Sequence, residues 1–220
     1  DSQERYNINI FKAANIIGNR WRPSGRLSYT DTSLVSTNST GMGNHVRWLA
    51  GACVNIRQGF IVSTAITGQD GRFTASRTFR GRISYFVQWA RHHYNIRNTS
   101  GYTATMAGFS TNHQQWIRNI HVTEGLHVYH SLIHVACLDY FYGDQFGLTS
   151  PRRGVKIRAR NTGQCTSSHA TIRKIFNGSD VLLCEVGRSH SRIYGTTIHE
   201  LAHSAHYQFN RPGYNKLVND

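Results

Sequence analysis

The chain has 220 residues, of which 39% are hydrophobic and 11% aromatic. This composition excludes an intrinsically disordered protein and provides enough apolar chain for one or two packed domains. No apolar run approaches the roughly 18 residues of a membrane-spanning helix, so we expect no membrane span.

The formal net charge is +14, and Lys12, Lys156, Lys174 and Lys216 are the only lysines among the 25 basic residues. Such a charge predicts attraction to polyanions, whether nucleic acid, acidic glycans or anionic membrane surfaces. The arginines are scattered along the chain, which is typical of a solvated surface. Two interpretations stay open: a solubilising surface, or an acidic polymer such as nucleic acid bound through surface arginines.

We divide the sequence into a segment or linker over residues 1–24, an accessory domain over 25–98 and a catalytic domain over 99–220. In the first segment, Ile8–Ile17 is compatible with a short helix that stops at Gly18. Pro23, Ser24 and Gly25 then read as a linker.

Residues 25–98 predict an antiparallel β-sandwich, because short β-rich runs alternate with Gly and Asp turns at about ten-residue spacing. Asp70-Gly71 is a typical hairpin turn. The expected strands are Arg26–Tyr29, Ala52–Ile56, Phe60–Val62, Arg72–Thr74 and Ile83–Trp89.

Two patterns in this region are Gly51-x-x-Val54-x-Ile56 and Thr64-Ala65-x-Thr67-x-x-Asp70-Gly71-x-Phe73. Together they are similar to the transthyretin-like, carboxypeptidase-regulatory β-sandwiches. That resemblance implies an accessory domain without catalytic activity.

Residues 99–220 predict an α+β domain. Trp116–Ile120 is compatible with a first helix, and Thr123-Glu124-Gly125 opens a long helical stretch to Tyr142 that Gly143 closes. Strands are expected at Val155–Ala159, Ala170–Ile175 and Val181–Glu185.

The long helix carries His127, His130 and His134 at offsets of three and four, which makes them a rival metal site. The alternative is that they are partly buried, hydrogen-bonded histidines. If this helix packs under the next one, one of the three could also donate a metal ligand there.

The motif that points most directly to a chemical function is His199-Glu200-x-x-His203. Thr196 or Thr197 would be the N-cap of the helix that carries it. Residues four apart lie on the same helix face, so His199 and His203 can point at one Zn²⁺ ion. Glu200 is placed to accept a proton from an activated water, which is the chemistry of peptide-bond hydrolysis.

This stretch resembles the active-site helix of the zincin metallopeptidases. The resemblance implies that His199 and His203 are zinc ligands and that Glu200 is the general base. A metzincin continuation is excluded, because His206 and Phe209 stand where that subclass has Gly and His. A gluzincin-like enzyme takes a later Glu instead, but the only carboxylate after His203 is Asp220.

Two explanations of the third ligand remain open. Either the domain is C-terminally incomplete and stops before its third ligand, or another part of the chain supplies one. Tyr207 and Tyr214 are candidates for stabilising an oxyanion through their hydroxyls.

Cysteine usage suggests an oxidising compartment, with Cys165 and Cys184 as the favoured disulfide pair and Cys137 as a buried apolar residue. The two-domain layout also resembles zinc peptidases of bacterial surface lipoproteins, which implies a secreted, periplasmic or cell-surface protein.

Three functions follow from these observations. The first is a zinc metalloendopeptidase acting on peptide or protein substrates. The second is a non-catalytic binding protein, a zincin relic acting through its β-sandwich. The third is a basic nucleic-acid-associated protein.

Overall fold

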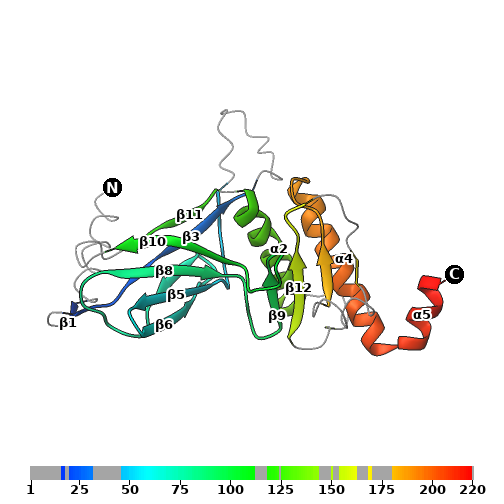
Figure 1. The fold of residues 1–220 in the computed structure, drawn as a ribbon, viewed down its shortest axis with the longest axis horizontal. Coiled ribbons are helices and arrows are strands. Elements are labelled where there is room, and N and C mark those ends of the chain that lie inside the picture. The colour runs from blue at the N-terminus through cyan, green and yellow to red at the C-terminus, as the bar shows by residue number, and fades with distance from the viewer. Residues whose placement is uncertain are drawn as a thin grey trace. The chain divides into compact units, whose positions relative to one another are not determined.

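The structure of the chain is a computed structural model that describes residues 16–17, 20–31, 46–111, 118–123, 125–143, 150, 154–162, 168–169 and 180–219. Within these ranges the secondary structure is mixed, with several sheets and three helices, which confirms the predicted α and β content (Figure 1). Two compact units emerge: a first unit of residues 1–28, 48–88 and 105–121, and a second unit of residues 29–47, 89–104 and 122–220.

The largest sheet of the first unit is antiparallel, with the order β10-β8-β5-β6. Its strands are β5 (Cys53–Gln58), β6 (Ile61–Ile66), β8 (Ile83–Gln88) and β10 (Thr105–Thr111). In β8, Ile83, Tyr85 and Val87 are buried and alternate with half-buried residues, as expected for a strand with one core-facing side. Gln58 pairs with Ile61, so Gly59 and Phe60 form a tight turn between β5 and β6.

A second sheet has the order β11-β3-β4, and β7 also pairs with β3. Its strands are β3 (Ser24–Thr30), β4 (Val46–Trp48), β7 (Arg72–Thr74) and β11 (Ile120–Val122). The rings of Phe73 in β7 and Tyr85 in β8 meet edge to face at 6.0 Å, which brings the buried sides of β7 and β8 together. The short strands β1 (Ile16–Ile17) and β2 (Arg20–Trp21) pair as a hairpin.

Two helical expectations are wrong where the structure describes them. Ile16 and Ile17 belong to β1, although most of the expected helix before them lies outside the described residues. Ile120 begins β11 and does not end a helix, while Trp116 lies outside the described residues. Short apolar runs fit either secondary structure, and pairing with a neighbouring strand decides between them.

The second unit contains a sheet with the order β13-β14-β12-β9. Its strands are β9 (Tyr94–Arg97), β12 (Val155–Ala159), β13 (Ser168–His169) and β14 (Val181–Leu183). β12 runs parallel to both β9 and β14, and β13 is an antiparallel edge strand. Helix α2 (Gly125–Tyr142) lies between β9 and β12 in the chain, as the connection of two parallel strands requires. The strand expected at Ala170–Ile175 lies outside the described residues.

The chain ends in two consecutive helices, α4 (His190–Phe209) and α5 (Arg211–Asn219), which Figure 1 draws in orange and red. Helix α4 begins well before the predicted caps Thr196 and Thr197. Its N-cap is Ser189, whose side chain accepts a hydrogen bond from the backbone N–H of Arg192. Thr197 is instead inside the helix, where its hydroxyl donates to the carbonyl of Ile193. None of the described helices is both long and apolar enough to cross a membrane.

Cys184 is disulfide-bonded, whereas Cys53 and Cys137 are free thiols. Cys165, the partner expected for Cys184, lies outside the described residues. Cys137 is completely buried in α2, as predicted, and this burial raises the pKa of its thiol.

Gly71 and Gly59 form a matched pair for testing backbone contact in the first unit. Both have positive φ, 71° and 57° respectively. A Cβ on Gly71 would collide with the carbonyl oxygen of Leu27, whereas one on Gly59 would meet nothing within 4 Å. We expect Gly71→Ala to lower the free energy of unfolding by about 2–4 kcal/mol and Gly59→Ala by only about 1 kcal/mol. Urea unfolding followed by tryptophan fluorescence measures both, and equal losses would contradict the collision.

Candidate metal centre

Helix α4 presents one buried face to the interior of the second unit. The buried residues are Ile193, Thr197, Glu200, Leu201, Ser204 and Ala205. Their spacing of three and four residues places them on one side of the helix. Helix α4 contacts α2, β13 and β14. This packing fixes which residues of α4 point away from the core.

His199 and His203 lie on the flank of α4 beside that buried face. A hydrogen bond of 2.9 Å joins their Nε2 atoms, and their rings meet edge to face with centroids 4.4 Å apart. His199 is exposed and His203 half-buried, so solvent reaches the pair. The two imidazoles therefore point the same ring nitrogen at one place, as the i, i+4 spacing predicts.

The protonation state of His203 suits a metal ligand. Burial first, and then the neighbouring His199 and His206, lower the pKa of His203 below its usual range. A lower pKa favours the neutral imidazole, which is the form with a free lone pair. The environment of His203 therefore favours the state in which it can coordinate a cation.

Glu200 is only 6% exposed and lies at the edge of the buried face nearest to His203. Its carboxylate acts on Tyr214, because the charge of Glu200 contributes to raising the pKa of that tyrosine. The structure therefore brings Glu200 and Tyr214 into one environment, next to the histidine pair.

Tyr214 reaches this environment because α5 folds back on the end of α4. Asn210 joins the two helices: its backbone N–H donates to the carbonyl of His206, and its side-chain oxygen accepts from the N–H of Gly213. The ring of Tyr214 lies 5.8 Å from that of His203 and 5.7 Å from that of His206. The sequence analysis did not identify the role of Asn210. The stretch Asn210-Arg211-Pro212-Gly213 does contain a signal for a helix break, because Pro and Gly follow closely on Asn.

The hydroxyl of Tyr214 stays protonated at neutral pH. Burial is the main cause of its raised pKa, followed by the charges of Glu200 and Tyr207. A protonated phenol can donate a hydrogen bond. Tyr207 also belongs to this cluster, with its ring 5.4 Å from that of Tyr214 and the Arg211 guanidinium 5.5 Å from its centre.

The residues present fit a zinc ion in part. Two imidazole nitrogens bound to one tetrahedral zinc at about 2.0–2.1 Å lie about 3.3 Å apart. The observed 2.9 Å is within a small ring rotation of that value. However, the described residues contain no group of three or more metal-ligating side chains. Asp220, the predicted downstream carboxylate, lies outside the described residues.

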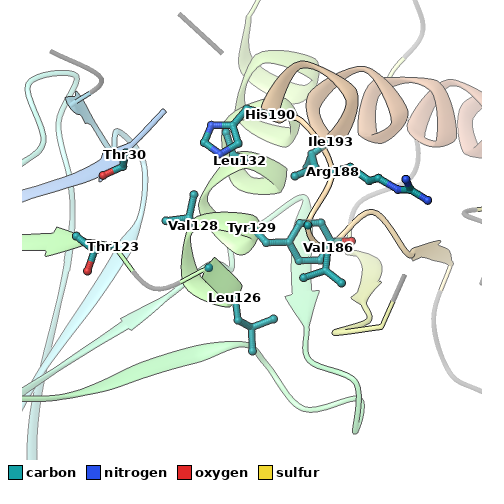
Figure 2. A pocket seen from close by; sticks show the side chains of 12 residues that line it. Thr30, Thr123, Leu126, Val128, Tyr129, Leu132, Val186, Arg188, His190 and Ile193 are labelled. Carbon is teal, nitrogen blue, oxygen red and sulfur yellow. The ribbon is translucent and has the colours of Figure 1, made fainter. Parts of the chain in front are cut away.

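A pocket of about 440 Å³ lies elsewhere in the second unit. Figure 2 shows that Val128 and Tyr129 of α2 line it opposite Val186 and Arg188, which precede α4. The nearest residues of α4 are His190 and Ile193. His199 follows His190 by nine residues, or about 14 Å along the helix axis. The pocket is thus separate from the histidine pair, and we assign the candidate site from the chemistry of the side chains.

Among the described residues, the histidines of α2 are not gathered into a group of three or more metal-ligating side chains. His134 accepts or donates a hydrogen bond at 3.0 Å through Nδ1 to the hydroxyl of Tyr94. His127 stacks on Trp89, with ring centroids 5.6 Å apart. His130 is 2% exposed and packs 5.2 Å from Trp89, and neither of its ring nitrogens has a hydrogen-bond partner among the described residues. Packing against aromatic rings is the observed role of this stripe.

Comparison of the chain with protein-family models, with curated proteins and with solved structures gives no match.

His130 gives the second unit a pH-dependent stability. Burial, with a smaller contribution from His127, lowers the pKa of His130 from 6.5 to about 4. In the unfolded chain His130 binds a proton below about pH 6.5, whereas the folded chain keeps it neutral until about pH 4. Acidification from pH 7.5 to pH 5 therefore lowers the free energy of unfolding by about 2 kcal/mol.

Urea unfolding at these two pH values tests this prediction. Circular dichroism of the helices is a suitable probe, because all the described helices lie in the second unit. His130→Phe should remove most of the loss on acidification, whereas the exposed His92→Gln should leave it unchanged. An equal loss in wild type and His130→Phe would contradict the assignment.

Proposed function

We propose that the chain is a zinc-dependent peptidase that uses the His199-Glu200-x-x-His203 segment of α4. The observation that carries this proposal is the approach of the two Nε2 atoms to 2.9 Å, with Glu200 buried beside them. The two Nε2 atoms share a hydrogen bond, and a zinc ion would join them in place of that hydrogen.

His199 and His203 would hold the zinc ion through Nε2. When bound, zinc would lower the pKa of a water to about 7 and polarise the carbonyl of a peptide bond. The lowered pKa of His203 supports this role, because protons compete less with the metal there.

Glu200 would act as the general base, accepting a proton from the attacking water and returning it to the leaving amine. Its low exposure keeps bulk water from competing for that proton. Tyr214 would stabilise the oxyanion by donating a hydrogen bond from its hydroxyl. The effect of the Glu200 charge on the pKa of Tyr214 supports assigning both groups to one site.

The edge strand β13 would bind the substrate backbone. β13 pairs antiparallel with β14 at the edge of the sheet and contacts α4. An extended peptide added to such an edge binds mainly through main-chain hydrogen bonds. The order of a helix, a sheet with an antiparallel edge and then the motif helix supports a zincin-like arrangement of the second unit. The disulfide of Cys184 supports a secreted or cell-surface location.

A second candidate is a zincin relic that binds partners without catalysis. It is favoured by the lack of a third metal-ligating side chain near His199 and His203 among the described residues. A two-ligand site would hold zinc weakly and exchange it readily. Zinc retention separates the two candidates.

The peptidase proposal predicts that Glu200→Gln abolishes turnover without loss of the metal. Removal of a general base typically costs about 10²–10⁴-fold in rate. A quenched-fluorescent peptide library measures the activity, and elemental analysis measures the zinc. Activity within about threefold of wild type in a zinc-loaded Glu200→Gln protein would refute the general-base role.

The proposal also predicts which histidines retain the metal. After dialysis, wild type should keep stoichiometric zinc, and His199→Asn or His203→Asn should lose about 10²-fold or more in affinity, because each removes a direct ligand. His206→Asn is the matched control and should retain zinc, because His206 is not part of the Nε2 pair. If wild type loses its zinc on dialysis, the relic is the better description.

A further inference from the structure

The turn between β5 and β6 in the first unit exposes a short apolar tip. Phe60 is fully exposed, and Ile61 and Val62, which follow it, are 47% and 48% exposed. The turn is held locally, because the Arg57 side chain donates to the carbonyl of Gly59 at 2.7 Å. A rigid turn that presents a phenylalanine entirely to water gains nothing from it in the folded monomer.

Three arginines lie at the same end of the sheet as this apolar tip. Arg57 pairs with Ser84 across β5 and β8, so Arg82, just before β8, lies at the end nearest to the Gly59–Phe60 turn, and its side chain donates to the hydroxyl of Ser110 in β10 at 2.9 Å. Gln58 donates its side-chain amide to the carbonyl of Arg80 and so ties the segment before β8 to the same end of the sheet. Among the described residues, no carboxylate pairs with Arg57, Arg80 or Arg82.

The rest of the first unit does not neutralise this charge. Its described arginines are Arg20, Arg22, Arg26, Arg57, Arg72, Arg77, Arg80, Arg82 and Arg118. The only described carboxylate of this unit is Asp70, which is paired with Arg72 at 3.1 Å. Asp70 follows the far end of β6, whereas Phe60 precedes its start. The tip therefore lies in a positive environment.

We propose that this tip, formed by Phe60, Ile61 and Val62, docks on anionic phospholipid membranes together with Arg57, Arg80 and Arg82 at the same end of the sheet. Interfacial binding combines apolar side chains inserted at the headgroup boundary with basic side chains beside lipid phosphates. Phe60, Ile61 and Val62 supply the apolar component, and Arg57, Arg80 and Arg82 supply the basic one. A membrane plane also accepts a protruding turn without a complementary groove.

A single-stranded nucleic acid is the competing polyanion, and the tip suits it less. Binding of single strands uses several aromatic platforms along a basic groove. Here one aromatic side chain is followed by two aliphatic ones, which cannot stack on bases. An acidic glycan would use the arginines but would gain nothing from Phe60, Ile61 and Val62.

Cosedimentation of the full chain with sucrose-loaded vesicles tests this proposal. Wild type should bind vesicles of equimolar phosphatidylcholine and phosphatidylserine, and should not bind pure phosphatidylcholine. Phe60→Ser should weaken this binding by about tenfold or more, through loss of a buried aromatic side chain. The double variant Arg57→Gln, Arg82→Gln should weaken it about 25-fold, at about fivefold for each basic residue.

Two controls match these changes at the far end of the same unit. Ile66→Ser removes a half-exposed apolar residue of β6, six residues and about 20 Å from Phe60. Arg72→Gln removes the same charge as each tip variant. Both controls should bind vesicles within about twofold of wild type. Circular dichroism checks that each variant is folded.

The outcomes separate the membrane from other partners. Failure of wild type to bind anionic vesicles, or equal binding by Phe60→Ser, overturns the proposal. Tighter binding of a single-stranded oligonucleotide that depends on Phe60 and Arg82 overturns it in favour of nucleic acid. Because no step involves the histidines of α4, vesicle binding and peptide hydrolysis succeed or fail separately.

Discussion

Helix α4 packs its Ile193, Leu201 and Ala205 side into the interior of the second unit, in contact with α2. This packing fixes the rotation of α4 about its own axis, and that rotation decides the environment of every polar residue in the motif. His199 and His203 come to the solvent side, whereas Glu200 comes to the edge of the core. A rotation of one residue, about 100°, in the direction that buries His203 would move Glu200 from the edge to the centre of the buried face.

The same packing explains why small and polar residues occupy the buried face of α4. Thr197 and Ser204 are completely buried. The hydroxyl of Thr197 is satisfied by the carbonyl of Ile193 one turn earlier, and such back-bonding lets a polar residue face a core. The hydroxyl of Ser204 has no hydrogen-bond partner among the described residues. Small side chains also allow close approach of neighbouring helices. The candidate site thus rests on a tight contact that offers little room for larger residues.

The sequence was sufficient for much of the local structure. The bounds of β12 and the end of α2 at Tyr142 were predicted as the structure has them, because each combines a clear period with a clear stop. The pair His199 and His203 could also be predicted, since the helical spacing alone places the two rings together. The start of α4 could not, because six of the nine residues between Ser189 and His199 are polar or small, and the burial of Ile193 in the core is what shows that they are helical.

Other features depend on contacts that the sequence does not display. In β6 the buried residues are Ser63 and Ala65, while Ile61, Val62 and Ile66 are exposed, which reverses the usual pattern. Ser63 is buried because its hydroxyl bonds Ser76, a residue remote in the chain. Likewise, the arrival of Tyr214 beside Glu200 depends on the reversal at Asn210, whose two hydrogen bonds were not evident from composition or period.

Both units are assembled from separated stretches of the chain, and this has a consequence for vectorial synthesis on the ribosome. The first unit needs residues up to 121, and the second begins as early as residue 29. β9 leaves the ribosome before α2, yet its partner β12 follows α2. The nascent second unit must therefore hold an unpaired parallel strand while the first unit is completed. Such an order favours late folding of both units together over the folding of one unit after the other.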